Sequence, residues 1–180
     1  YRSAGASVKL KPKTHSNDFP EVLYNWSSRK CLIVDDNKDV LLYLNRVLAD
    51  TGIGIYSASS GAEALEILTR TPDMYVVLLD MQMPGMNGID ATNAIMERHP
   101  KTRVLIVTQH EDRQYVVPLL QAGASGYILK RALGSDLITA LRKAARGEVY
   151  LDPSVTGTVV EELRDHAGGD RVGAESLTPR

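Results

Sequence analysis

The chain has 180 residues, of which 43% are hydrophobic and 24% charged, and this is ordinary usage for a soluble globular protein. Its formal net charge of −1 provides no global field that would attract nucleic acid or an anionic membrane. The only cysteine, Cys31, excludes an internal disulfide framework, and no apolar run approaches the roughly 20 residues of a membrane span. Composition therefore predicts a cytoplasmic protein with no membrane partner.

The first part of the chain, residues 1–29, is polar and has no sustained periodicity, so we expect an N-terminal tail. Residues 30–146 alternate between short apolar runs and helical patterns, five times over. The apolar runs predict strands at about 30–35, 53–58, 74–80, 103–108 and 125–129. Helical patterns follow the strands, and the last two lie at about 111–122 and 134–146.

The connections between the expected strands are each long enough to contain a helix, which is what parallel strands with right-handed crossovers require. The motifs at the strand ends all differ, so the pattern does not indicate a solenoid of repeats. We therefore predict one domain of the α/β class over residues 30–146, with a doubly wound five-stranded parallel sheet.

The character of the sequence changes after this domain. We expect a linker over 147–175 that contains one amphipathic helix at about 153–166. The apolar side of this helix would consist of Val155, Val159, Val160 and Leu163. In the last segment, 176–180, Thr178 and Pro179 form a cap followed by proline at the first helical position, so another helix is expected to begin there.

Polar residues stand at the carboxyl ends of four expected strands. The first strand ends in Asp35 and Asp36, the third in Asp80, the fourth in Thr108, and the fifth in Lys130. In open α/β sheets the ligand site lies beyond the carboxyl ends of the strands, so these side chains are expected to converge. Two carboxylates about 4 Å apart repel by roughly 4 kcal/mol at an effective dielectric constant of about 20, so the cluster needs a bound cation or a proton.

Carboxylate, water and phosphate oxygens are ligands that suit Mg²⁺. A carboxylate next to Mg²⁺ can attack phosphorus and form an aspartyl phosphate, while Lys130 and Thr108 pair with the phosphoryl oxygens. The alternative is that the aspartates are turn and cap residues, for which Asp39 is a candidate, and that Lys130 is a solvated surface lysine. The joint placement of these residues at strand ends favours the phosphoryl site.

Residues 30–146 resemble the receiver domain of two-component response regulators. The matching segments are 34–37 (VDDN), 78–88 (LLDMQMPGMNG), Thr108 and 123–130 (GASGYILK). The resemblance implies a flavodoxin-like fold and a protein that accepts a phosphoryl group from a sensor histidine kinase. It also implies that the protein is not an enzyme with a separate substrate, because it catalyses only its own phosphorylation and dephosphorylation.

The same resemblance implies roles for the strand-end residues. Asp80 would be the phosphoacceptor, assisted by Lys130 and Thr108. The Mg²⁺ ligands that the resemblance implies are Asp36 directly, Asp35 mostly through water, Asp80, and the backbone carbonyl of Gln82.

Thr108 and Tyr127 would form a switch pair by this resemblance. On phosphorylation the threonine hydroxyl would move toward the phosphoryl group and the tyrosine ring would turn inward. That change would reshape the face formed by the fourth helix, the fifth strand and the fifth helix, and would favour a homodimer. Gln109 departs from the family pattern, in which the residue after the switch threonine is commonly small, so Gln109 and Gln82 are candidates for tuning donor access and phosphoryl lifetime.

The ending Leu177-Thr178-Pro179-Arg180 resembles the start of the helix-turn-helix output domain of LuxR/FixJ-type transcriptional regulators. By that resemblance, 176–180 begins a truncated output domain and DNA would be bound only through its missing part. Two alternatives stay open: the receiver of a hybrid histidine kinase, and a stand-alone interaction module. An aspartate-based phosphohydrolase is disfavoured, because Gln82 rather than an aspartate stands two residues after Asp80.

Overall fold

The structure is a computed structural model that describes residues 25–109 and 113–169. The expected tail up to residue 24 and the ending Leu177-Thr178-Pro179-Arg180 lie outside the described residues. Within the described part of the chain, no helix combines the length and the apolar character that crossing a bilayer requires.

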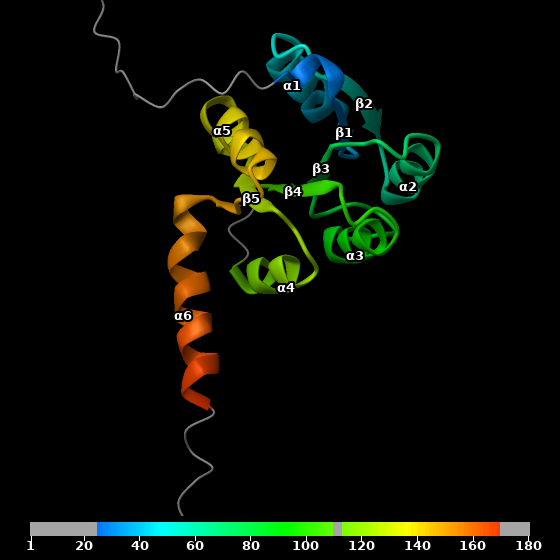
Figure 1. Ribbon diagram of the computed structural model, residues 1–180. Helices are drawn as coiled ribbons and strands as arrows, with labels where there is room; N and C mark the ends of the chain where they lie inside the picture. The colour runs from blue at the N-terminus through cyan, green and yellow to red at the C-terminus, as the bar shows by residue number, and fades with distance from the viewer. Residues whose placement is uncertain (1–24, 110–112, 170–180) are drawn as a thin grey trace, which may run out of the picture.

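One parallel sheet of six strands forms the centre of the fold, in the order β2-β1-β3-β4-β5-β6 (Figure 1). Its strands are β1 (Lys30–Val34), β2 (Gly54–Ala58), β3 (Val76–Asp80), β4 (Arg103–Thr108), β5 (Gly126–Leu129) and β6 (Tyr150–Leu151). The chain moves outward from β1 to β2 and then returns to β3 on the other side of β1, so the order reverses between β1 and β3. The predicted doubly wound, flavodoxin-like α/β fold is confirmed.

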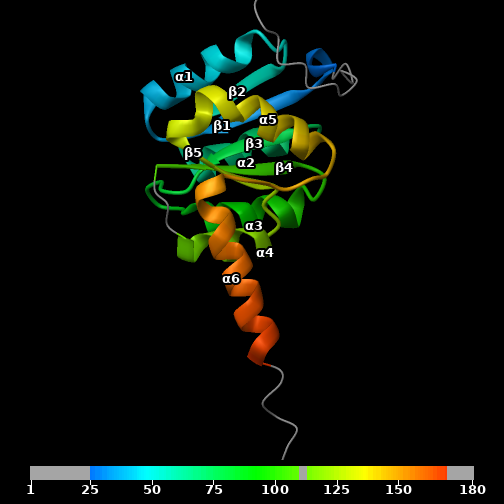
Figure 2. The same cartoon turned by 90° about the vertical axis from the view of Figure 1, so that its left-hand side faces the viewer.

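Helices cover both faces of the sheet (Figure 1, Figure 2). They are α1 (Lys38–Ala49), α2 (Gly61–Arg70), α3 (Gly88–Arg98), α4 (Val116–Gln121), α5 (Leu133–Ala145) and α6 (Pro153–Gly169), with short 3-10 helices at Trp26–Ser28, Arg113–Tyr115 and Lys130–Ala132. Buried side chains of α1 and α5 belong to one apolar cluster, and those of α2, α3, α4 and α6 belong to the other. The sheet is therefore the middle of three layers.

The interior positions of the central strands are apolar because both faces of these strands are covered, and polar residues stand at the strand ends. In β1, Leu32 and Val34 belong to the cluster of α2, α3 and α4, whereas Cys31 and Ile33 belong to that of α1 and α5. Burial raises the pKa of the Cys31 thiol to about 12, so this cysteine is a core side chain and not a reactive thiol.

Helix α4 is shorter than the sequence pattern predicts. The expected helix spans about 111–122, whereas α4 spans Val116–Gln121 and follows the 3-10 turn Arg113–Tyr115. Pro118 explains the difference, because proline in a helix interior has no N–H to donate and its ring clashes with the carbonyl four residues earlier. Neither defect matters in the first turn, so the α-helix begins where Pro118 falls within that turn.

The sequence pattern predicts five strands, and the sixth, β6, is a correction to that prediction. The chain turns at Gly147, whose φ is +77°, and Tyr150–Leu151 then pair with Gly126 and Tyr127 of β5. The Tyr150 N–H donates a hydrogen bond of 3.1 Å to the Ser125 carbonyl. A strand of two residues has no usable hydrophobic periodicity, which is why the pattern does not reveal it.

Helix α6 is the predicted linker helix, and it continues past the predicted end at 166 to Gly169. Val155 is fully buried and Val159 is half-buried, as predicted, but Val160 is 43% exposed. Adjacent residues of a helix point about 100° apart, so Val159 and Val160 cannot both face the same neighbouring helix. The side chain of Leu163 lies outside the described set.

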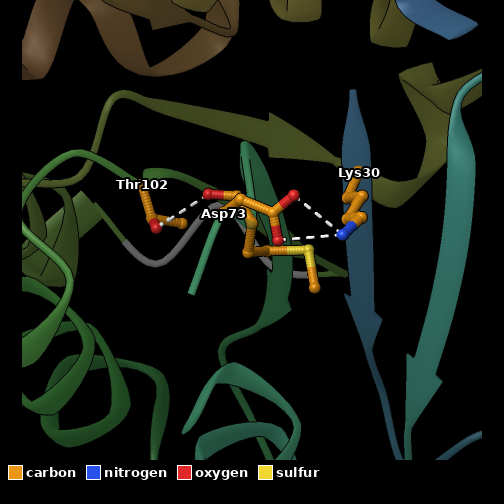
Figure 3. Close-up of polar contacts among 4 residues, drawn as sticks. Lys30, Asp73 and Thr102 are labelled. Atoms are coloured by element: carbon orange, nitrogen blue, oxygen red, sulfur yellow. Dashed lines mark hydrogen bonds and ion pairs between the residues drawn. The ribbon is translucent and has the colours of Figure 1, made fainter. Parts of the chain in front are cut away.

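Polar contacts at the amino ends of the strands join loops to the sheet on the side opposite to the strand ends discussed above (Figure 3). Lys30 Nζ donates hydrogen bonds of 2.9 and 2.7 Å to the two carboxylate oxygens of Asp73. Thr102 Oγ1 donates a hydrogen bond of 3.0 Å to the Met74 carbonyl. The Lys30–Asp73 pair is exposed, so water screens it, whereas the Thr102 contact is buried and satisfies a backbone acceptor.

Substitution of Gly126 tests the close approach of β6 to β5. A Cβ at this position would lie 2.7 Å from the Tyr150 carbonyl oxygen and 2.8 Å from Leu105 Cδ2. We therefore expect Gly126→Ala to lower the free energy of unfolding by about 1–3 kcal/mol in urea denaturation. The matched control is Gly157→Ala in α6, where a Cβ meets nothing within 4 Å and the helix should gain up to about 1 kcal/mol. Equal effects of the two variants would contradict tight β5–β6 packing.

Candidate functional site

Three carboxylates gather where the strand order reverses. Asp35 and Asp36 follow β1, Asp80 ends β3, and these two strands are direct neighbours. One carboxylate oxygen from each residue lies within 4.8 Å of the others. Asp35 and Asp80 are buried and Asp36 is exposed, so the cluster has a buried base and one open side. The structure brings together the three aspartates that the sequence pattern places at strand ends.

Lys130 reaches this cluster from β5, which lies two strands from β3 on the side away from β1. It follows β5, and its Nζ lies 2.6 Å from Asp35 Oδ2 and 3.3 Å from Asp80 Oδ1. Its side chain is only 12% exposed, which excludes the alternative of a solvated surface lysine. One ammonium group therefore faces two buried carboxylates, and the local charge of the cluster stays negative.

The alternative in which the aspartates serve turns and caps accounts for only part of their contacts. Asp35 Oδ1 accepts a hydrogen bond of 2.9 Å from the Asn37 N–H, whereas the buried Asp35 Oδ2 has only the Lys130 ammonium beside it. The N-cap of α1 is Asn37, whose side chain accepts a hydrogen bond of 2.9 Å from the Asp39 N–H, so Asp39 is not the cap. The sequence pattern does not single out Asn37, although asparagine between a strand end and a helix is a preferred cap.

Burial raises the pKa of Asp80, because its carboxylate is largely removed from water. Lys130 acts in the opposite direction, the neighbouring Asp35 carboxylate raises the pKa further, and a hydrogen bond from the Gln82 backbone N–H lowers it. The net direction is upward, so Asp80 takes up a proton more readily than an ordinary aspartate. A bound cation would favour the ionised form, which is the nucleophilic one.

A cavity of about 260 Å³ opens above the carboxylates. The residues that line it are Asp36, Asn37, Asp80, Gln82, Gln109 and Lys130. All of them offer charged or polar groups, which suits a small hydrated or anionic group better than an apolar ligand. A larger cavity of about 520 Å³ lies at the opposite edge of the sheet, beside Asp73 and Thr102, so size alone does not identify the site.

The donors around this cavity suit a hard divalent cation. The three aspartates and the backbone near Gln82 offer oxygen ligands, and oxygen is the ligand atom that Mg²⁺ and Ca²⁺ prefer. The exposed side of Asp36 leaves room for water molecules to remain on the cation. The residues present therefore fit such an ion by charge and by ligand type.

Thr108 and Tyr127 lie on the two strands that follow β3 across the sheet. Asp80 pairs with Val107, so Thr108 stands one residue further toward the carboxyl edge of the neighbouring strand. Tyr127 pairs with Ile106, and both Thr108 and Tyr127 are 1% exposed. Both side chains make contacts within the fold. The structure therefore encloses this pair in the core, with Thr108 on the strand next to Asp80 and Tyr127 one strand further away.

Comparison with known proteins agrees with this geometry. The profile of the response regulator receiver domain matches residues 31–142. The oxygen regulatory protein NreC of Staphylococcus carnosus is 37% identical over 145 residues, which cover 78% of this chain and 66% of that protein. This chain thus spans slightly less than two thirds of that relative.

Two solved structures are also similar. A LuxR-family two-component response regulator from Aurantimonas sp. SI85-9A1 has a TM-score of 0.69 at 27% identity, covering 75% of this chain and 97% of that chain. A chain of the CheX-CheY-BeF3-Mg²⁺ complex from Borrelia burgdorferi has a TM-score of 0.62 at 28% identity, covering 65% and 89%. Since the family profile covers more than half of the sequence, the chain belongs to the response regulator receiver domain family.

Proposed function

We propose that this chain is a phosphorylation-controlled receiver in which Asp80 accepts a phosphoryl group from a sensor histidine kinase. The observation that carries the proposal is the pairing of one ammonium with two buried carboxylates, with Lys130 Nζ at 2.6 Å from Asp35 and 3.3 Å from Asp80. A buried cluster with excess negative charge lowers the stability of the fold, and it is expected where a cation and a phosphoryl group bind. The comparisons support the receiver class, and the phosphoryl chemistry is our proposal.

In the proposed reaction, an ionised oxygen of Asp80 attacks phosphorus and the bond from phosphorus to the donor breaks. The donor leaves with the electron pair of that bond, and an acyl phosphate remains on Asp80. Lys130 is positioned to pair with a phosphoryl oxygen, because its ammonium already lies beside Asp80. Thr108, at the neighbouring strand end, is proposed to donate its hydroxyl to another phosphoryl oxygen.

The proposed cofactor is Mg²⁺, which when bound would neutralise charge on the carboxylates and on the phosphoryl group. The residues proposed to hold it are Asp36 directly, Asp35 mostly through water, Asp80, and the backbone carbonyl of Gln82. The similar CheX-CheY complex from Borrelia burgdorferi was crystallised with BeF3 and Mg²⁺, which supports this choice. Gln82 and Gln109 line the same cavity and are proposed to tune donor access and phosphoryl lifetime.

The proposed switch passes from Asp80 through Thr108 to Tyr127. If the Thr108 hydroxyl moves toward a phosphoryl group, the space that it leaves favours a buried Tyr127 ring. The consequence would be a changed face at α4, β5 and α5 and a homodimer that forms on phosphorylation. We assign no separate substrate to the protein, since its relatives are regulators and the chemistry is that of its own Asp80.

The whole protein is proposed to be a cytoplasmic transcriptional regulator of the LuxR/FixJ type. Relatives that include a protein named transcriptional regulatory protein DegU, from Brevibacillus brevis, support this class. In this proposal residues 30–146 are the receiver, 147–175 link it to an output domain, and 176–180 begin that domain. DNA would be bound by the output domain and not by the receiver.

Labelling with acetyl phosphate and Mg²⁺ tests the phosphoacceptor. The parent chain should gain one phosphoryl group in intact-mass spectrometry, and Asp80→Asn should gain none because it lacks the nucleophilic oxygen. The label should be labile to base, as acyl phosphates are. The control is Glu66→Gln, which removes one negative charge at an exposed position of α2 and should be labelled like the parent. Persistent labelling of Asp80→Asn at a single aspartate would contradict the assignment.

Substitution of Lys130 separates phosphorylation from its consequence. Lys130→Ala should leave Mg²⁺ binding largely intact, because the proposed ligands remain, but the phosphorylated and unphosphorylated forms should no longer differ in oligomeric state. Size-exclusion chromatography with light scattering measures this difference. Lys101→Ala removes an exposed lysine beside the cavity at the opposite edge of the sheet and should behave like the parent. A difference in Lys130→Ala as large as in the parent would show that Lys130 is not the coupling residue.

The raised pKa of Asp80 gives a stability prediction. The folded state binds a proton at Asp80 more tightly than the unfolded state, so this group's contribution is lost as pH rises through its folded pKa. Without divalent ions and near neutral pH, Asp80→Asn should therefore have a larger free energy of unfolding than the parent, by on the order of 1 kcal/mol. The difference should be smaller at the lower pH at which carboxyl groups ordinarily titrate.

Mg²⁺ should reverse this order of stability. It should stabilise the parent by mass action and stabilise Asp80→Asn much less. Thermal melts with and without Mg²⁺ measure both effects, and Glu66→Gln controls for the loss of one charge. A destabilised Asp80→Asn in the absence of metal would mean that Lys130 outweighs the cost of burying the ionised carboxylate.

A further inference from the structure

The cavity of about 520 Å³ at the opposite edge of the sheet, here called the amino-edge cavity, has no part in the phosphoryl chemistry. The loops that precede β3 and β4 line it, together with Arg29 in front of β1. Met74 and Thr102 are buried members of this lining, and most of the others are exposed, so the cavity opens to solvent from a buried base. Among the described residues, none lines both this cavity and the one above the carboxylates.

Backbone hydrogen bonds hold the walls of the amino-edge cavity in place. The Tyr75 N–H donates to the Lys30 carbonyl at 3.0 Å, and the Arg103 N–H donates to the Tyr75 carbonyl at 2.9 Å. Within the loop before β4, the Thr102 N–H donates to the His99 carbonyl at 2.9 Å. The cavity is therefore preformed, and a ligand would bind without first ordering these loops.

Positive charge is in excess around the amino-edge cavity. Its lining contains the cations Arg29, Arg98 and Lys101 and the single carboxylate of Asp73. That carboxylate already faces Lys30, which donates hydrogen bonds of 2.9 and 2.7 Å to its two oxygens (Figure 3). Within the described part of the chain, none of the three lining cations makes an ion pair. Like charges at one cavity repel each other, and a bound anion would relieve this repulsion.

An aromatic ring positions one of these cations. The Arg29 guanidinium carbon lies 4.3 Å from the centroid of the Tyr75 ring, and Trp26 packs edge-on against the same ring at 6.3 Å between centroids. Stacking uses the face of the guanidinium group, so the N–H groups at its edge stay available to donate to an anion. Tyr75, Pro72 and Pro100 add apolar surface to the same lining.

We propose that the amino-edge cavity binds a small organic anion that carries a phosphate monoester on a flat apolar ring. The guanidinium groups of Arg29 and Arg98 would hold the phosphate, because their planar N–H forks match its oxygens, and the ring would lie against Tyr75 and the two prolines. A phosphate monoester carries nearly two negative charges at neutral pH, which suits several cations better than one carboxylate does. We assign no contact to Lys101. The proposal is independent of phosphorylation at Asp80.

The test titrates the full chain with phenyl phosphate, which combines both parts of the proposed ligand. Divalent ions are left out, so that the site at Asp80 lacks its proposed cation. Saturable changes in amide NMR shifts should be confined to residues 72–75, 98–102 and the segment around Arg29. Phenol and inorganic phosphate each carry one part of the chemistry and should bind at least about tenfold more weakly. Trp26 is the only tryptophan of the chain, so its fluorescence gives a second readout at this edge.

Two arginine substitutions separate specific binding from general attraction. Arg98 is an exposed residue at the end of α3, so Arg98→Ala should leave the fold intact and weaken phenyl phosphate binding about tenfold, through loss of charged hydrogen bonds. Arg98→Lys should recover only part of the affinity, because an ammonium group lacks the planar fork. The control is Arg46→Ala, which removes the same charge from an exposed position of α1 and should bind like the parent.

Several results would overturn the proposal. The absence of a saturable shift at about 10 mM phenyl phosphate would exclude even a weak site. Equal effects of Arg98→Ala and Arg46→Ala would show attraction by net charge alone. Inorganic phosphate that binds as tightly as phenyl phosphate would remove the role of the ring, and shifts centred on Asp80 and Lys130 would place the ligand at the other edge of the sheet. None of these results would affect the proposed phosphorylation of Asp80.

Discussion

The pairing of Lys130 with two buried carboxylates is the constraint on which the rest of the site depends. One ammonium cannot fully offset Asp35 and Asp80, and the pKa of Asp80 is raised, mainly by burial and further by the Asp35 carboxylate. The cluster persists because the strands that end in these residues are fixed by apolar burial on both faces of the sheet, independently of the charges. Such a local cost is expected where a fold keeps groups for binding instead of for stability.

The order of the strands explains how this cluster connects to distant surfaces. The reversal between β1 and β3 brings the aspartates together, and β4 and β5 then contribute Thr108 and Lys130 in turn. The same strand β5 carries Tyr127, and β6 attaches α6 to its free edge. A row of hydrogen-bonded neighbouring strands thus lies between Asp80, at the end of β3, and α6, which follows β6.

Much of the site is predictable because a short apolar run marks a buried strand and its last residue marks the carboxyl edge. This reasoning identifies Asp35, Asp80 and Lys130 without any knowledge of distances. The same reasoning does not find β6, because Tyr150 and Leu151 pair with β5 only where β5 has a free edge and where Gly126 has no Cβ to block the approach. Pro118 indicates where α4 begins, but the flanking residues have a helical period that predicts an earlier start.

The docked α6 limits how a second copy of the chain can bind. A tethered segment has an effective concentration on the order of millimolar for short connections, so it outcompetes a partner at micromolar concentration for the same surface. A homodimer through the proposed face would therefore have to displace α6 from α4 or approach from α5, whose buried side chains belong to the other apolar cluster.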